Sequence, residues 1–334
     1  MSEYFGITQD PITKDIMIIM PYYNLGDLIN YISNDFFSIS WKIKLDKLKD
    51  IIFGLKEIHI VSIIHRDFHS GNIFFNNNGI SDIDKVVIGD LGISKSAAES
   101  NDDNENYGII PYMAPEIFQG QKYSKASDIY SFGMIMWELM TGRRPFWDRN
   151  HDTELIIEIC DGERPPIVTN APEDYIDLMK ECWHSDPNKR PIANYVKYKI
   201  EEILRKNNQI PTEIIASSDI GPVTTNNPGA IYKSRPLSGM IQSAMSTRRL
   251  RSQSITSNDL FYNYQKRNIS FNVKEKRKLE DNQIENRFNE GKRIKNIKLN
   301  ENENNDYDTK EFELDIDLDI NDEKYITQEI DFDI

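Results

Sequence analysis

The segment His65-Arg66-Asp67-Phe68-His69-Ser70-Gly71-Asn72 says more about the fold of this 334-residue chain than any other part of it. Asp90-Leu91-Gly92 begins 18 residues after Asn72, and Ala114-Pro115-Glu116 follows further along the chain. Each of these short matches arises by chance often. In this order and at these distances, the three segments form one signature that leaves very little room for coincidence.

The hydrophobic pattern around this signature predicts two strands followed mostly by helices. Residues 4–9 and 16–20 are predicted strands, joined by a turn at Asp10-Pro11. From Trp41 to Ile58, apolar residues recur every three or four positions, as on one face of a long amphipathic helix. Shorter β-like runs and further helices are predicted at 63–64, 73–75, 86–88, 127–140, 153–160, 175–183 and 192–206. This order of elements indicates the α+β class.

With these features the chain resembles the eukaryotic-type protein kinase family, and more narrowly its tyrosine-kinase-like group. Segments 127–133 and 186–191 support the resemblance, which covers residues 4–205. It implies a protein-kinase-like fold with a mainly helical C-lobe and only a remnant β-hairpin of the N-lobe. The implied kinase domain is 1–207, with a partial N-lobe at 1–20, a hinge at 21–26 and the C-lobe at 27–207.

The resemblance also implies a catalytic apparatus that uses ATP and Mg²⁺ on a protein substrate. Phosphoryl transfer depends on alignment and on cations that absorb the charge of the γ-phosphate. Asp67 would orient the substrate hydroxyl or accept its proton. Asn72 and Asp90 would hold Mg²⁺, which prefers hard oxygen ligands.

On the nucleotide side, the resemblance implies that Met20 borders the adenine pocket and that Tyr22 and Tyr23 belong to the hinge. Adenine would be held by backbone groups there, and the N–H and C=O of Tyr23 are expected to be available. Asp27 is a candidate partner of a ribose hydroxyl, although N-capping of the following helix explains it more economically.

Other matching positions are expected to be structural or regulatory. His65, Glu116, Asp128 and Arg190 are expected to be structural, with Glu116 and Arg190 forming a buried ion pair and Asp128 anchoring the catalytic loop. Arg66 is placed to pair with a phosphate on the activation segment. The candidate acceptors in that segment are Ser94, Ser96, Ser100 and Tyr107. A solvated acidic loop is the competing interpretation of the same segment.

Two departures from the family pattern bear on function. The chain holds no Gly-rich loop and no phosphate-gripping strand lysine before Tyr4, so a catalytically impaired pseudokinase acting as a scaffold is the alternative to an active enzyme. The apolar surface that the hairpin exposes is expected to invite a partner protein or aggregation, and a truncated product without an independent fold is the third hypothesis. His69 and Ile109 occupy two positions that bear on whether the acceptor is serine/threonine or tyrosine. Tyr112-Met113 favours serine/threonine specificity.

Composition separates the remaining residues from this domain. The net charge is −10 over residues 1–207, +8 over 208–300 and −12 over 301–334. We expect 208–334 to be a disordered tail whose acidic end binds partners. The two cysteines, Cys160 and Cys182, lie in apolar stretches and fit a reducing compartment, so the expected location is intracellular and cytoplasmic, with the nucleus as the alternative. Neither membrane nor nucleic-acid binding is expected.

Overall fold

The computed structural model describes residues 2–77, 85–91, 93–96, 106–167 and 171–251. They all belong to one compact unit. The second unit, Ile255–Thr327, lies outside the described residues.

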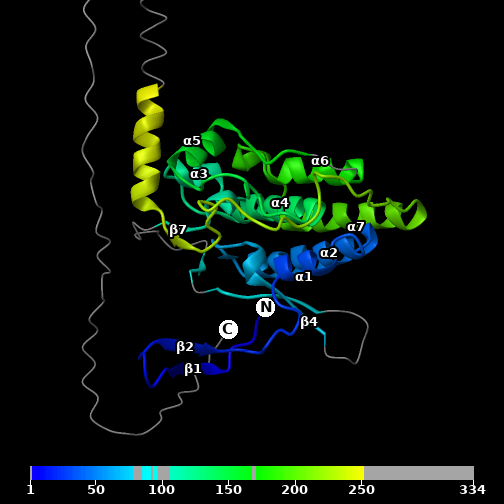
Figure 1. Ribbon diagram of the computed structural model, residues 1–334, viewed down its shortest axis with the longest axis horizontal. Coiled ribbons are helices and arrows are strands. Elements are labelled where there is room, and N and C mark those ends of the chain that lie inside the picture. Colours follow the sequence, from blue (N-terminus) through cyan, green and yellow to red (C-terminus); the bar gives the residue numbers. More distant parts are fainter. Residues whose placement is uncertain (1, 78–84, 92, 97–105, 168–170, 252–334) are drawn as a thin grey trace, which may run out of the picture. The chain divides into compact units, whose positions relative to one another are not determined.

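Helices are the main regular structure of the described unit (Figure 1). They are α1 (Leu28–Asp35), α2 (Trp41–Ile60), α3 (Pro115–Phe118), α4 (Lys125–Thr141), α5 (Thr153–Asp161), α6 (Glu173–Cys182), α7 (Ala193–Gln209) and a further helix at 238–251. Three short 3₁₀ turns are η1 (Ser70–Asn72), η2 (Ile110–Tyr112) and η3 (Pro187–Lys189). The strands are β1 (Gly6–Gln9), β2 (Ile16–Ile19), β3 (Ile63–Ile64), β4 (Ile73–Asn76), β5 (Lys85–Ile88), β6 (Lys95–Ser96), β7 (Tyr107–Gly108) and β8 (Arg235–Pro236).

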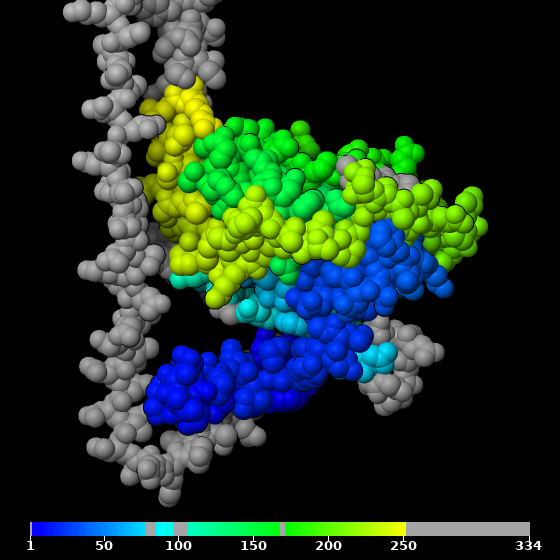
Figure 2. Space-filling model, in the orientation of Figure 1, coloured from blue at the N-terminus to red at the C-terminus, as the bar shows by residue number. Residues whose placement is uncertain are grey.

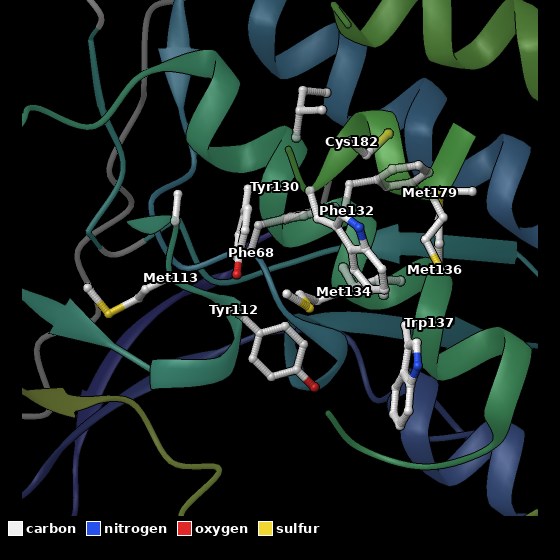
Figure 3. Close-up of a cluster of buried hydrophobic side chains, with 14 of the residues drawn as sticks. Phe68, Tyr112, Met113, Tyr130, Phe132, Met134, Met136, Trp137, Met179 and Cys182 are labelled. Atoms are coloured by element: carbon white, nitrogen blue, oxygen red, sulfur yellow. The ribbon is translucent and has the colours of Figure 1, made fainter. Parts of the chain in front are cut away.

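The central helix is α4, in which every residue from Ser127 to Thr141 is buried. A helix that is buried on all sides belongs to the interior of a helical layer rather than to its surface. It packs against α6 and α2, and α2 in turn lies along α7 (Figure 1). Aromatic and sulfur-containing side chains fill the space around α4, among them Phe68, Trp137 and Met179 (Figure 3). The mainly helical C-lobe expected from the sequence is confirmed.

Local sequence signals begin and end these helices. The side chain of Asp27 accepts a hydrogen bond from the Asn30 N–H at 2.9 Å and so caps α1. Gly142, with φ +73°, terminates α4 in the left-handed conformation that the sequence predicts. Of the helices in the described residues, none combines the length and the apolar character needed to cross a bilayer.

The strands of the described residues associate in antiparallel pairs, β1–β2, β3–β6, β4–β5 and β7–β8. The β1–β2 pair is the expected remnant hairpin, and all four residues of β2 are exposed. In the β4–β5 pair Ile73 lies opposite Ile88, so the chain segments that carry Asn72 and Asp90 leave the pair side by side. This register positions the candidate metal ligands.

Residues 208–251 correct the predicted domain boundary. They were expected to be disordered, yet Ile220, Leu237, Ile241 and Ala244 are buried in the same hydrophobic core as α4. The segment 210–251, here called the C-terminal strap, covers one side of the helical layer and ends in the helix 238–251 (Figure 2). Leu237, Ile241 and Ala244 recur at the spacing of one helix face, whereas Ile220 stands outside any such period and fills a site that other elements have built. The predicted disorder of 252–334 lies outside the described residues.

Candidate active site

Asp128, in the first turn of α4, anchors the loop between β3 and η1. Its carboxylate accepts hydrogen bonds from the backbone N–H groups of His65 at 2.9 Å and Arg66 at 3.0 Å. The His59 ring lies 2.8 Å away on the same carboxylate, which is 1% exposed. Arg66 has φ +71°, an unfavourable conformation for a side chain with a Cβ, and the bond to Asp128 holds it there. Asp128 thus makes contacts that suit the anchoring role expected of it, and that role stays a prediction.

Asp67 follows this strained turn and is 8% exposed. Burial by itself raises the pKa of Asp67, but hydrogen bonding and charge from His69, together with the Ser234 hydroxyl, outweigh burial and lower the pKa. His69 Nε2 lies 3.5 Å from the Asp67 carboxylate. The Asn72 amide donates to the Asp67 backbone carbonyl at 2.9 Å. The site therefore holds an ionised carboxylate in a fixed direction.

Gly89 connects the two candidate metal ligands. Its N–H donates to the Asn72 carbonyl at 2.9 Å, and its own carbonyl lies 3.2 Å from the His65 ring nitrogen. Asp90, the next residue, is exposed and has φ +57°. The His65 ring therefore holds the backbone next to Asp90, which supports the structural role expected of His65.

The donor set of Asn72 and Asp90 fits Mg²⁺. The Asn72 amide nitrogen is already bound to Asp67, which leaves the amide oxygen as its acceptor, and Asp90 supplies a carboxylate at the surface. In the part of the chain that the structure describes, no group of three or more His, Cys, Asp and Glu side chains could hold a metal. Mg²⁺ bound with a nucleotide typically takes only one or two protein ligands, with phosphate and water completing its shell.

The hinge residues are only partly as expected. The Tyr23 carbonyl accepts a turn hydrogen bond from the Gly26 N–H at 3.1 Å, so one of its two lone pairs is engaged, and the availability of this residue to adenine stays a prediction. The Tyr23 ring stacks on Phe74 with centroids 5.2 Å apart, and its hydroxyl lies 2.7 Å from the Ser2 hydroxyl. Tyr22 is 87% exposed, Met20 is half-buried, and Asp27 caps α1.

Glu116 and Arg190 form the expected buried ion pair. Two guanidinium nitrogens of Arg190 donate to the two carboxylate oxygens at 2.7 and 2.6 Å. Arg190 also donates to the Ala126 carbonyl at 2.9 Å, beside the start of α4. The pair joins α3 to η3 and so stabilises the end of the activation segment, the stretch from Asp90 to Glu116.

A buried polar cluster that sequence reasoning missed joins the catalytic loop to this segment. The Glu138 carboxylate accepts from the Ser70 hydroxyl at 3.1 Å and from the Tyr112 hydroxyl. Burial raises the pKa of Glu138 to about 8. The Tyr112 ring also lies 5.8 Å from that of His69. A lone glutamate within the apolar run of α4 was the available signal.

The predicted phosphoacceptors of the activation segment are not brought together. Ser94 donates to the Leu91 carbonyl at 2.7 Å, and Tyr107 is 37% exposed in β7. Ser96 lies in β6, whereas Ser100 is outside the described residues. Arg66 stacks over the Tyr123 ring, 4.7 Å from its centroid. Its pairing with a phosphate and the role of these acceptors stay predictions.

Comparison with known proteins agrees with this geometry. The family described as protein tyrosine and serine/threonine kinase matches residues 3–200, more than half of the chain. The chain therefore belongs to the protein kinase family.

Similar relatives occur in Dictyostelium discoideum. A protein named a probable serine/threonine-protein kinase is 30% identical over 206 residues, which is 57% of this chain and 13% of that protein. The probable serine/threonine-protein kinase roco5 is 33% identical over 187 residues, 52% of this chain and 6% of its own length. A probable LIM domain-containing serine/threonine-protein kinase is 31% identical over 170 residues, 50% of this chain and 25% of that protein. The chain thus spans a quarter or less of the length of these relatives.

Proposed function

We propose that this chain transfers the γ-phosphate of ATP to serine or threonine hydroxyls of proteins. The observation that carries the proposal is Asp67, an ionised and nearly buried carboxylate at the end of a loop that Asp128 holds by two backbone hydrogen bonds. A carboxylate fixed in this way can orient a hydroxyl and receive its proton as the hydroxyl oxygen attacks.

The other residues of the site align and compensate charge. Asn72 holds the Asp67 backbone through its amide nitrogen, and its amide oxygen with the Asp90 carboxylate would bind Mg²⁺. The bound metal would supply positive charge against the phosphates. His69 contacts Asp67 on one side, while its other ring nitrogen accepts from the Gly71 N–H at 3.0 Å. This bond orients the ring so that its Nε2 faces the carboxylate.

Two observations support serine/threonine specificity: the names of the relatives, and the conformation of the last residues of the activation segment. The relatives above are all named as serine/threonine-protein kinases. Ile109 and Tyr112 are buried against α4, and the Ser131 hydroxyl donates to the Tyr112 carbonyl at 2.7 Å. The stretch whose sequence favours Ser/Thr kinases is therefore held in one fixed conformation.

Phosphate incorporation into a protein substrate from labelled Mg²⁺–ATP tests this function. Asp67→Asn keeps the size of the side chain but removes the charge and the proton acceptor, so we expect the rate to fall at least about 100-fold. Asp177→Asn, on the exposed face of α6, is the matched control and should leave the rate unchanged. Equal rates for Asp67→Asn and the wild type would contradict the proposal.

A second candidate is a binding protein whose catalytic site is impaired. It is favoured by the position of the N-terminal residues: Ser2 N–H donates to the Ile88 carbonyl at 2.7 Å, and the Tyr4 hydroxyl accepts from the Asp90 N–H at 3.0 Å. Ser2 and Tyr4 thus lie against the loop that carries Asp90, a candidate metal ligand, and this placement favours the impaired-site candidate. Titration with Mg²⁺–ATP distinguishes the candidates, because micromolar affinity supports the enzyme, and weak or no binding supports the binding protein.

A further inference from the structure

The C-terminal strap, which the proposed catalytic chemistry does not use, leads from α7 to the candidate active site. Its first half is fixed to the turn that follows α4. The Gly221 N–H donates to the Thr141 carbonyl at 2.7 Å, and the Asn227 N–H donates to the Trp147 carbonyl at 2.9 Å. These backbone bonds direct the following residues toward the activation segment.

The strap then adds a strand to the activation segment. β8 pairs antiparallel with β7, with Arg235 opposite Gly108. The Leu237 N–H donates to the Asn106 carbonyl at 2.8 Å, and the Ser238 hydroxyl accepts from the Asn106 N–H at 2.9 Å. An extended peptide that adds to a strand edge gains affinity from backbone bonds and selectivity from the sites that take its side chains.

Ser234, immediately before β8, is thereby brought to the catalytic aspartate. The Ser234 hydroxyl is one of the groups that lower the pKa of the Asp67 carboxyl, after burial, which raises it, and His69, which lowers it. His69 Nε2 lies 3.5 Å from the same carboxylate. The Ser234 residue is partly exposed, so its oxygen is not sealed inside the core. A hydroxyl beside an ionised carboxylate is the arrangement that phosphoryl transfer requires of its acceptor.

Side chains on both sides of Ser234 hold it in this place. The Tyr232 ring packs against His151 with centroids 4.8 Å apart, and its hydroxyl donates to the Pro145 carbonyl at 2.9 Å. Three residues after Ser234, Leu237 is 1% exposed in the hydrophobic core. An aromatic anchor two positions before the hydroxyl and an apolar anchor three positions after it fix the strand in one register.

We propose that the strap is an intramolecular protein substrate, in which Tyr232 and Leu237 anchor the strand in the substrate site and Ser234 is the phosphoacceptor. This inference rests on the proposed kinase function. It also defines the acceptor class for other proteins: an extended segment with an aromatic residue two positions before the serine and an apolar residue three positions after it. While the unmodified strap is bound, it excludes such proteins from Asp67.

The chemical step is balanced within the proposed reaction. A bond forms between the Ser234 oxygen and the γ-phosphorus of ATP, the bond from that phosphorus to the oxygen of ADP breaks, and the hydroxyl proton passes to Asp67. Once Asp67 has released this proton to water, the product holds a phosphate of about −1.5 to −2 charge beside the Asp67 carboxylate. Repulsion between these like charges favours release of the strap, so the modification opens the site.

Mass spectrometry of the full chain after incubation with Mg²⁺–ATP tests the acceptor. We expect phosphate on Ser234, lost in Ser234→Ala and kept in Ser246→Ala, at a fractional rate that does not change over a tenfold dilution of the protein. A rate that falls tenfold on dilution would overturn the intramolecular route. Labelling of an added protein without labelling of Ser234 would overturn this inference alone, whereas labelling of neither would overturn the kinase function as well.

Amide hydrogen exchange supplies a readout that needs no catalysis. Ser234→Glu places a charge against Asp67, so exchange at residues 106–108, 235 and 237 should rise at least about tenfold. Ser246→Glu adds the same charge on the exposed face of the strap helix and should leave exchange at these residues unchanged. Equal exchange in the two variants would show that Ser234 does not face the aspartate, and would overturn the proposal.

Discussion

The catalytic loop, residues 63–72, carries Asp67, and the C-terminal strap passes beside that loop. The two segments are held in place by different kinds of contact. The loop is fixed from beneath by one buried carboxylate, that of Asp128, which binds two successive backbone N–H groups. The strap is fixed by dispersed backbone hydrogen bonds and by single apolar side chains such as Ile220 and Leu237. The loop should therefore fail as a whole when its anchor is lost, whereas the strap can be released without unfolding the helical layer.

This difference suits two different tasks. A catalytic carboxylate must keep its direction, and a strained residue such as Arg66 keeps its conformation only when its surroundings over-determine it. A substrate segment must leave after reaction, which requires contacts that can be broken one at a time. The three predictions below test the comparison, beginning with the largest expected effect.

Asp128→Ala tests the single anchor of the loop. The change leaves the buried N–H groups of His65 and Arg66 without a partner and removes the contact to His59, so the free energy of unfolding should fall by about 3–5 kcal/mol. Urea denaturation measures this loss. Asp177→Ala, on the exposed face of α6, is the control and should stay within about 0.5 kcal/mol of the wild type. Similar urea midpoints for the two variants would contradict the claim that the loop depends on the single anchor Asp128.

Glu138→Gln tests the buried contact between the loop and the activation segment. Because burial raises the folded-state pKa to about 8 from a usual 4.5, the folded protein retains the Glu138 proton over a range in which the unfolded chain has lost it. The stability of the wild type relative to the variant should thus be greatest below about pH 4.5 and decrease as the pH rises toward about 8.

Urea unfolding of both proteins at several pH values measures this difference, in which other titrating groups largely cancel. A single unit of pKa separation corresponds to about 1.4 kcal/mol, and we expect a decrease of at least that size. Parallel curves for the wild type and Glu138→Gln would contradict the assignment of the titration to Glu138.

Gly221→Ala tests the strap and should have the smallest effect on global stability. Gly221 has φ +96°, and an added Cβ would lie 2.8 Å from the Phe37 ring, so local strain and a clash should together cost about 2 kcal/mol. Gly162 has φ +107° with no neighbour within 4 Å of an added Cβ, and Gly162→Ala should cost only about 1 kcal/mol.

Limited proteolysis and urea unfolding of these two glycine variants separate local release from global destabilisation. We expect Gly221→Ala to increase cleavage within 210–237, while Gly162→Ala leaves that cleavage rate unchanged. If Gly221→Ala loosened the catalytic loop as much as the strap, the two regions would not be independent.

Much of the catalytic loop could be predicted from the sequence alone. Asp67, Asn72, Asp90, Asp128 and the pair of Glu116 and Arg190 stand in motifs whose spacing identifies them, and the structure places Asp128, Glu116 and Arg190 in the expected contacts. Helix boundaries followed from equally local signals, such as the Asp27 cap and Gly142. These features depend on residue type and on spacing along the chain, which is what a sequence displays.

The strap and the cluster around Glu138 were decided by tertiary structure. Glu138 meets Ser70 and Tyr112 only because α4 passes beneath both segments, a contact between residues 68 and 26 positions apart. In the strap, Ile220 belongs to no local pattern, since the site that it fills is formed by elements distant in sequence. The sequence by itself determined the family and the catalytic loop, whose signals are local. Only the folded surface determined that a mostly polar segment after α7 would pack on the helical layer and pair with the activation segment.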